Sequence, residues 1–439
     1  MIIKDLFRNS IRIYLVAFFT SFLGLISQVL IARTYGASSV IDAYLASIAI
    51  PVFLTSFITS ACSYGLIPRL TEYQNNQEEF IHFTKSILFL GVLVAVFYMF
   101  MFFLSPIQAA YYKNFIDIDE QTLLVLFQIG WLIGIAQIFV SINSSILNAK
   151  SFYALSTSFA SFPYIGIIIS LALLNQNQSI LNLSYGLLIG TILAVITSSF
   201  FLSKELFTKT DNFLINPTKY IIEISNTSIK AVAMASIFTS YMIIDAYWAP
   251  RLGDGILATL GYSQRVIGTL GAISIMAIYV ITGREAQSEL SSKGMSAFRE
   301  LSKSFIKLSF ILSTALAIFL FLFIENIIEL LFESKNFKKQ DIISLAKTIK
   351  FMLPGMICML VSTILLKLIL CLKNSFQFAL GLGFCWPALY FSGIFFLNEF
   401  ALTGIAISYS VAWFVIVLIL LINILVRTRE KVLNNMTTV

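Results

Sequence analysis

The sequence ALTGIAISYSVAWFVIVLILLINILV, residues 401–426, runs for 26 positions without a charged side chain. About 20 apolar residues in a helix are enough to cross the hydrocarbon core of a bilayer, so this stretch predicts a transmembrane helix. Eleven further stretches of similar character lie near 11–34, 40–67, 84–106, 121–147, 152–174, 180–203, 225–249, 255–282, 305–331, 341–371 and 376–397. The sequence therefore predicts an all-α polytopic membrane protein with about 12 transmembrane helices.

The composition agrees with a chain that lies almost wholly in the membrane. Hydrophobic residues make up 58% of it and charged residues 12%, against about 25% charged in soluble domains. The longest polar stretches, 204–227 and 283–304, are too short for a soluble domain and are interpreted as cytoplasmic connections with amphipathic helical pieces. No G-x-x-x-x-G-K-[ST] motif occurs, so the chain itself offers no phosphate-cradling loop for ATP.

Lysine and arginine are distributed unevenly between the two sides of the predicted bundle. Most of the 29 basic residues fall in the terminal segments and in the connections on the same side, among them Lys4, Arg8, Lys150 and Arg427. Cytoplasmic loops carry such an excess, which predicts that both termini are cytoplasmic. The net charge of +7 then reflects topology and anionic lipid, and it does not indicate nucleic acid.

The sequence holds few residues suited to metal or redox chemistry. Cys62, Cys358, Cys371 and Cys385 lie in apolar segments without a C-x-x-C pair and are interpreted as packing residues. His82 is the single histidine, and one histidine cannot make a metal site. We expect no metal and no cofactor, apart from a coupling Na⁺ or H⁺.

The spans divide into an N-terminal lobe, 1–215, with helices 1–6, and a C-terminal lobe, 216–439, with helices 7–12. Two weak matches recur at corresponding places in the halves: ARTYG at 32–36 with APRLG at 249–253, and LNAKSF at 147–152 with LCLKNSF at 370–376. Six spans return the chain to its starting side, so the repeats run parallel. Transporters built this way place the substrate site at the repeat interface. The sequence thus predicts two pseudo-symmetric lobes around a central cavity.

Glycine and proline punctuate several spans. Gly130-x-x-x-Gly134 and Gly186-x-x-x-Gly190 predict that two helices approach each other closely. Pro51 and Pro354 lie inside spans, where each removes a backbone hydrogen bond and predicts a kink or hinge. The alternative is that membrane helices are simply richer in both residues.

Two basic residues lie inside spans, where an ionisable group is costly and marks a functional site. Arg265 lies about ten residues into the eighth span, and its guanidinium fork suits a phosphate or pyrophosphate. The alternative is an ion pair with a neighbouring helix, for example through Asp245. Lys367, near the cytoplasmic end of the tenth span, either binds phosphate or snorkels to the interface.

Four further residues are candidates for the transport site. Asp42 and Asp245 lie near the outer boundary and are candidates for coupling to an ion, although a carboxylate there also caps helices or meets water. Tyr44 and Tyr262 are candidate substrate contacts, because polar aromatic side chains can stack on sugar rings. Packing is the alternative for both tyrosines.

Several motifs resemble those of the MviN/MurJ-type lipid flippases, which belong to the multidrug/oligosaccharidyl-lipid/polysaccharide exporter superfamily. The matching stretches are LIARTYGA at 30–37, DAY at 42–44, Ile50-Pro51, IPRLTEY at 67–73, LNAK at 147–150, Ile244-Asp245 and YSQR at 262–265. The resemblance implies two six-helix lobes around a cavity that opens alternately inward and outward. It also implies substrates that are undecaprenyl-pyrophosphate-linked sugars, and it places Arg265 on an arginine important in that family and Lys367 on a matching basic position.

The chain also departs from the family's pattern. Lipid II flippases carry a cluster of arginines in their first two helices, where this chain has Ser21, Ser27 and Thr55, and Gln28 replaces an acidic residue. They also usually have fourteen helices. Both differences favour the Wzx-like branch: a flippase that moves an O-antigen or capsule repeat unit on undecaprenyl pyrophosphate across the bacterial inner membrane by alternating access. A lipid II flippase of the MurJ type is the alternative.

A membrane-embedded polysaccharide polymerase or ligase is the rival from another class. Such enzymes act through sizeable periplasmic loops, whereas the loops near 105–120 and 333–341 are short and lack histidine. An antiporter for cationic drugs would need acidic groups where the deep spans hold Arg265 and Lys367. We therefore expect a transporter and no enzyme, whose partners are the lipid-linked glycan, membrane lipids and other polysaccharide-assembly membrane proteins.

Overall fold

A computed structural model of the chain describes residues 2–62, 66–73, 76–173, 179–203, 238–372 and 376–436, and over these residues it contains helices and no strands. The chain forms two compact units, one made of residues 1–258 with 334–337 and the other of 259–333 with 338–439. The all-α fold class is confirmed. The predicted lobe boundary at 215 and 216 falls outside the described residues and stays a prediction.

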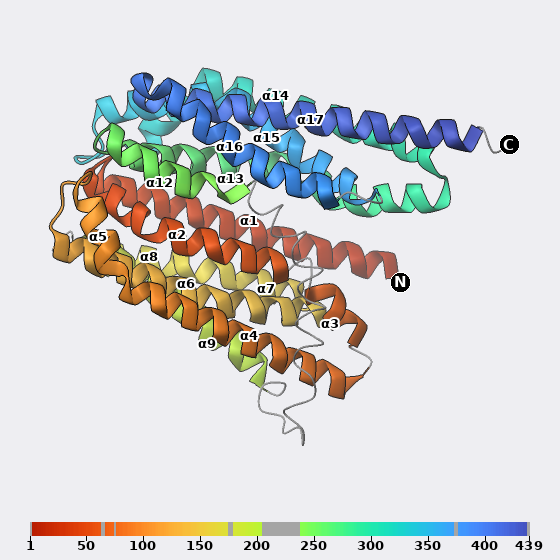
Figure 1. Cartoon of the computed structure of the whole chain (residues 1–439), viewed down its shortest axis with the longest axis horizontal. Coiled ribbons are helices and arrows are strands. Elements are labelled where there is room, and N and C mark those ends of the chain that lie inside the picture. Colours follow the sequence, from red (N-terminus) through yellow and green to blue (C-terminus); the bar gives the residue numbers. More distant parts are fainter. Residues whose placement is uncertain are drawn as a thin grey trace. The chain divides into compact units, whose positions relative to one another are not determined.

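The long helices of the first unit overlap the predicted spans, whereas the short helices at 67–73 and 105–113 were not predicted as separate elements. Figure 1 shows the arrangement of the helices of this unit. They are α1 (Ile2–Tyr35), α2 (Ser39–Ala61), α3 (Ile67–Tyr73), α4 (Gln77–Phe103), α5 (Ser105–Lys113), α6 (Glu120–Ala149), α7 (Tyr153–Ser158), η2 (Phe159–Ser161), α8 (Phe162–Leu173), α9 (Ile180–Phe201) and α12 (Tyr241–Leu252). The start of the predicted span 225–249 and the polar connection 204–227 lie outside the described residues.

The second unit holds longer helices. They are α13 (Ile256–Ser292), whose first three residues belong to the first unit, α14 (Met295–Phe332), α15 (Lys339–Leu370), α16 (Phe376–Leu397), η4 (Asn398–Phe400) and α17 (Ala401–Met436). The polar stretch 283–304 is almost entirely helical, because α13 and α14 both extend into it and turn at Gly294, where φ is +82°. In the part of the chain that the structure describes, nine segments are long and apolar enough to cross a membrane, and the last, Gly381–Arg427, includes parts of both α16 and α17.

Contact between α2 and α6 depends on a proline and two glycines. Pro51 has no N–H, so the carbonyl of Ser47 lacks its helical hydrogen bond. A Cβ on Gly130 would lie 2.4 Å from that carbonyl oxygen, and a Cβ on Gly134 would lie 3.1 Å from Pro51 Cβ. The helices therefore touch backbone to backbone at the proline, and the close approach predicted from Gly130-x-x-x-Gly134 is confirmed.

The second glycine motif joins α8 to α9, which lie side by side in the first unit (Figure 1). A Cβ on Gly190 would lie 2.4 Å from the carbonyl oxygen of Phe162, and a Cβ on Gly166 would lie 2.2 Å from the carbonyl oxygen of Gly186. Small residues let helix backbones approach in lipid, where burial of apolar surface between helices gains little. This motif thus also acts as predicted.

Replacing Gly190 with alanine is expected to destabilise the first unit. The added methyl group meets backbone atoms that cannot rotate away, and such overpacking costs about 1–3 kcal/mol of unfolding free energy. The measurement is the thermal unfolding midpoint of the purified protein in detergent. Gly381→Ala is the matched control, since a Cβ at Gly381 in α16 meets nothing within 4 Å. Equal midpoints for the two variants would contradict the role given to Gly190.

Aromatic packing organises the second unit, in which α15 packs along both α14 and α17. Trp386 of α16 lies 5.0 Å from Tyr390 and 5.4 Å from Trp413 of α17, measured between ring centroids. All three side chains are buried. On α15, a Cβ at Gly355 would lie 2.8 Å from the Cα of Ser410, so α15 and α17 are in backbone contact one residue after Pro354.

Candidate functional site

Arg265 lies on α13, in the second unit, one turn after Gly261. Its side chain is partly buried, and its neighbour Tyr262 is fully buried with its ring centroid 6.0 Å from that of Phe332 on α14. One turn further, a Cβ on Gly268 would meet nothing within 4 Å, so there is open space beside this face of α13. The helix thus anchors Tyr262 in the packing against α14 and leaves room on the surface near Arg265.

Lys367 of α15 binds a tyrosine of α13. Its Nζ donates to the backbone carbonyl of Tyr279 at 2.7 Å and lies 3.4 Å from the centroid of the same tyrosine ring. The hydrogen bond and the cation–π contact together hold the ammonium group between the two helices. Snorkelling and phosphate binding were the alternatives from the sequence; this contact with Tyr279 is a third role, which only the structure reveals.

Replacing Lys367 with methionine is expected to destabilise the second unit. A hydrogen bond from a charged donor contributes about 1.5–3 kcal/mol, and methionine keeps the side-chain length while removing the donor and the charge. The measurement is the unfolding midpoint in detergent, with Lys347→Met as control, because Lys347 is an exposed lysine on the same helix. A midpoint unchanged from that of the wild type would show that the contact with Tyr279 contributes nothing.

Arg265 and Lys367 are not brought together. Tyr279, the partner of Lys367, is 14 residues beyond Arg265 on the same helix, which places the two sites about 21 Å apart along α13. A pyrophosphate group is far shorter than this. A single diphosphate therefore cannot contact both residues in this arrangement.

Asp42 binds the first turn of α13. Its Oδ2 accepts from the Gly255 N–H and its Oδ1 accepts from the Ala258 N–H, each at 2.7 Å. The carboxylate is buried, at 1% exposure, and it lies at the positive end of the helix dipole. Gly255 has φ +72°, and a Cβ there would lie 2.4 Å from the carbonyl oxygen of Ala37, so two turns of the first unit meet at this point.

Tyr44 and Asp245 are also buried in the first unit, at 3% and 2% exposure. Tyr44 follows Asp42 on α2, and Asp245 lies in the middle of α12. Both oxygens of Asp42 are used in capping α13, which was one of the sequence-based alternatives for a carboxylate at this boundary. Ion coupling by Asp42 or Asp245, and substrate contact by Tyr44 or Tyr262, stay predictions.

The hydroxyl groups of Ser56 and Thr59, on the second half of α2, were not predicted as site residues from the sequence. Ser56 Oγ lies 2.9 Å from Thr239 Oγ1, and Thr59 Oγ1 lies 2.7 Å from Ser141 Oγ on α6. Thr55, noted above as a departure from the flippase pattern, is buried, and its Oγ1 lies 3.1 Å from the hydroxyl of Tyr98. These hydroxyl residues recur within an otherwise apolar span, and this pattern could have identified them from the sequence.

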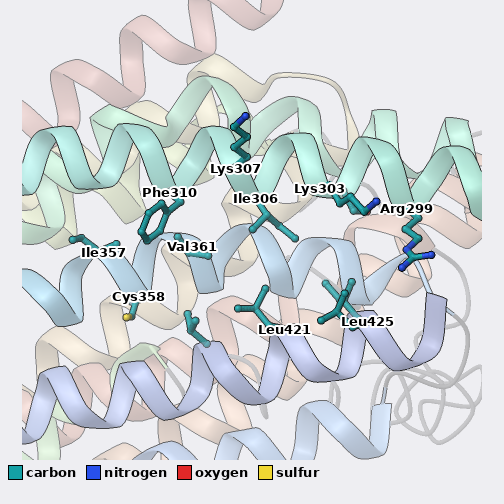
Figure 2. A pocket seen from close by; sticks show the side chains of 13 residues that line it. Arg299, Lys303, Ile306, Lys307, Phe310, Ile357, Cys358, Val361, Leu421 and Leu425 are labelled. Atoms are coloured by element: carbon teal, nitrogen blue, oxygen red, sulfur yellow. The ribbon is translucent and has the colours of Figure 1, made fainter. Parts of the chain in front are cut away.

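A cavity of about 430 Å³ lies in the second unit, lined by residues of α14, α15 and α17 (Figure 2). None of the six predicted site residues lines it. Its basic residues are Arg299, Lys303 and Lys307, and their spacing of four places them along one side of α14. That spacing at the start of a span is visible in the sequence.

Family comparison gives a match over most of the chain. The family model described as "Lipid II flippase MurJ" matches residues 31–438. A protein described as a probable lipid II flippase MurJ from Buchnera aphidicola subsp. Baizongia pistaciae is 24% identical over 428 residues, covering 93% of this chain and 81% of that protein. One with the same description from Thermotoga maritima is 24% identical over 347 residues, covering 76% of this chain and 68% of that protein.

Solved structures show the same fold. A structure described as the lipid II flippase MurJ in an inward closed conformation superposes with a TM-score of 0.80 at 19% identity, covering 94% of this chain and 87% of that one. An inward-facing multidrug resistance transporter of the MATE family superposes with a TM-score of 0.75 at 12% identity, covering 94% and 95% of the two chains. At these identities the likeness concerns the fold alone.

Proposed function

Because this chain belongs to the MurJ family of lipid II flippases, we propose that it moves lipid II, the undecaprenyl-pyrophosphate-linked precursor of peptidoglycan, across the bacterial inner membrane. The observation that carries the proposal is the family match over residues 31–438. The proposed activity is the transport of intact lipid II from one leaflet to the other by alternating access.

The comparisons favour the lipid II alternative over the O-antigen or capsule repeat unit. The preference for the repeat unit rested on the serine and threonine residues at arginine positions and on the count of twelve helices. These are local departures, whereas the family match extends over nearly the whole chain. The lipid II alternative is therefore the better supported of the two substrates.

Arg265 is the residue to which we assign the pyrophosphate. A guanidinium keeps its charge at every physiological pH and can bind two phosphate oxygens at once. Translocation also requires that the substrate bind the inward and outward states differently, because only differential affinity shifts a conformational equilibrium. Phosphate binding by Lys367 stays a prediction; its Nζ donates to the Tyr279 carbonyl, about 21 Å from Arg265 along α13, so we assign the pyrophosphate to Arg265.

The test is complementation of a bacterium depleted of its own lipid II flippase. We expect this chain to restore growth and to restore exposure of lipid II on the outer leaflet, measured by a membrane-impermeant label on the peptidoglycan precursor. A strain that lacks its O-antigen flippase serves as the parallel host. Rescue of O-antigen export alone, with lipid II left on the inner leaflet, would overturn the proposal. It would indicate that the substrate is the O-antigen repeat unit.

A further inference from the structure

The cavity of the second unit is apolar along most of its length. Ile306 and Phe310 of α14, Val361 of α15 and Leu421 of α17 line it, and Figure 2 shows these side chains between the three helices. Phe310 is exposed, so the cavity opens at the surface of this unit. Its volume of about 430 Å³ falls in the range of small-molecule pockets.

One end of the cavity is basic. Arg299 lies near Leu425 at that end, with Lys303 beside it on α14 (Figure 2). Nε of Arg299 is buried and has no hydrogen-bond acceptor among the described residues. A buried donor without an acceptor is unfavourable, so this end of the cavity favours a ligand that supplies an acceptor. Lys303 is paired with Glu300 at 2.7 Å, which leaves Arg299 as the principal cation at this end of the cavity. Lys307 lies about two turns further along α14.

We propose that this cavity binds an anionic glycerophospholipid, with the phosphate on Arg299 and one acyl chain between α14, α15 and α17. The guanidinium fork fits phosphate oxygens, and the apolar walls fit hydrocarbon. The basic end is the one that the distribution of lysine and arginine assigns to the cytoplasmic leaflet, where anionic lipids attract basic residues. This site is separate from the one proposed around Arg265.

The lining excludes other kinds of ligand. Ser302 and Cys358 are the only uncharged side chains with polar or sulfur atoms among the residues that line the cavity. A sugar headgroup would leave its hydroxyls without partners there, and unpaired buried polar groups are costly. A molecule with one charged end and a long apolar body satisfies both parts of the cavity.

The first test measures lipid retention by the purified full-length chain. The protein is stripped of lipid in detergent and exposed to mixed micelles of dioleoylphosphatidylglycerol or dioleoylphosphatidylcholine, and bound lipid is counted by native mass spectrometry. We expect retention of the anionic lipid, weakened about 10-fold in Arg299→Gln, which corresponds to loss of one charge-assisted contact. Lys347→Gln, which removes one exposed charge elsewhere in the unit, leaves retention unchanged.

The second test uses the thiol of Cys358, which lines the cavity and is partly exposed. We expect dioleoylphosphatidylglycerol to slow alkylation of Cys358, read from its own peptide by mass spectrometry, while Cys385 outside the cavity reacts at an unchanged rate. Equal protection by inorganic phosphate would show an anion site without a lipid chain and overturn the proposal. Equal retention of both lipids, or protection only by an undecaprenyl phosphate, would overturn it as well. These readouts need no flipping, so they succeed or fail independently of the proposed function.

Discussion

Arg265→Ala is expected to abolish lipid II translocation while the protein still inserts into the membrane. Arg265 lies ten residues into α13, partly buried and next to the anchored Tyr262, so its position is fixed by the helix. A bidentate contact with phosphate contains two charge-assisted hydrogen bonds, each contributing about 1.5–3 kcal/mol, so its removal corresponds to a loss of at least roughly 100-fold in binding. The measurement is labelling of lipid II at the outer leaflet in complemented cells, with protein amount checked in the membrane fraction.

Two further variants distinguish the effect of the guanidinium's shape on translocation from the effect of its charge. Arg265→Lys keeps a positive charge but lacks the planar fork, so translocation should fall to an intermediate level. Lys335→Gln removes one exposed charge and should transport normally. Wild-type labelling in Arg265→Ala would remove this residue from the transport site.

Asp42→Ala is expected to have the largest effect on stability. The substitution leaves the N–H groups of Gly255 and Ala258 buried without their acceptor, and each such group costs about 1–3 kcal/mol. The first turn of α13 then loses its attachment to α2. We expect a strong fall in the unfolding midpoint and in the amount of folded protein, measured by size-exclusion chromatography after heating.

Asp119→Ala is the matched control for Asp42→Ala. Asp119 is the N-cap of α6; it is exposed and its hydrogen bonds are local, including one from the Thr122 N–H at 2.7 Å, so its loss should cost about 1 kcal/mol. Asp42→Asn keeps one amide oxygen as an acceptor and should lie between wild type and alanine in stability. If Asp42 couples transport to an ion instead, Asn will abolish transport at nearly wild-type stability, and the capping explanation of its importance fails.

Much of the fold could be predicted because it depends on local properties of the chain. The predicted span 180–203 is observed as Ile180–Phe201, and 341–371 as Lys339–Leu370. An isolated segment in lipid must satisfy its own backbone hydrogen bonds, so a long apolar stretch has few options besides a helix. The glycine motifs were predictable for the same reason, since a missing Cβ is visible in the sequence.

The roles of the polar residues could not be predicted in this way. Asp42 reaches Gly255 across 213 positions, and Lys367 reaches Tyr279 across 88. Nothing in the neighbourhood of either residue identifies its partner. The same holds for Arg299, whose importance arises only when α15 and α17 close an apolar cavity beside it.

The sequence by itself determined that this protein is a bundle of membrane helices and where those helices run, because the bilayer requires that each apolar segment satisfy its own backbone. Its motifs also indicated the resemblance to the lipid flippases. Only the tertiary structure decided which polar groups are already paired and which face open space. That division follows from hydrogen bonding: a buried charge is defined by the partner it meets, and partners far apart in the chain meet only when the helices pack.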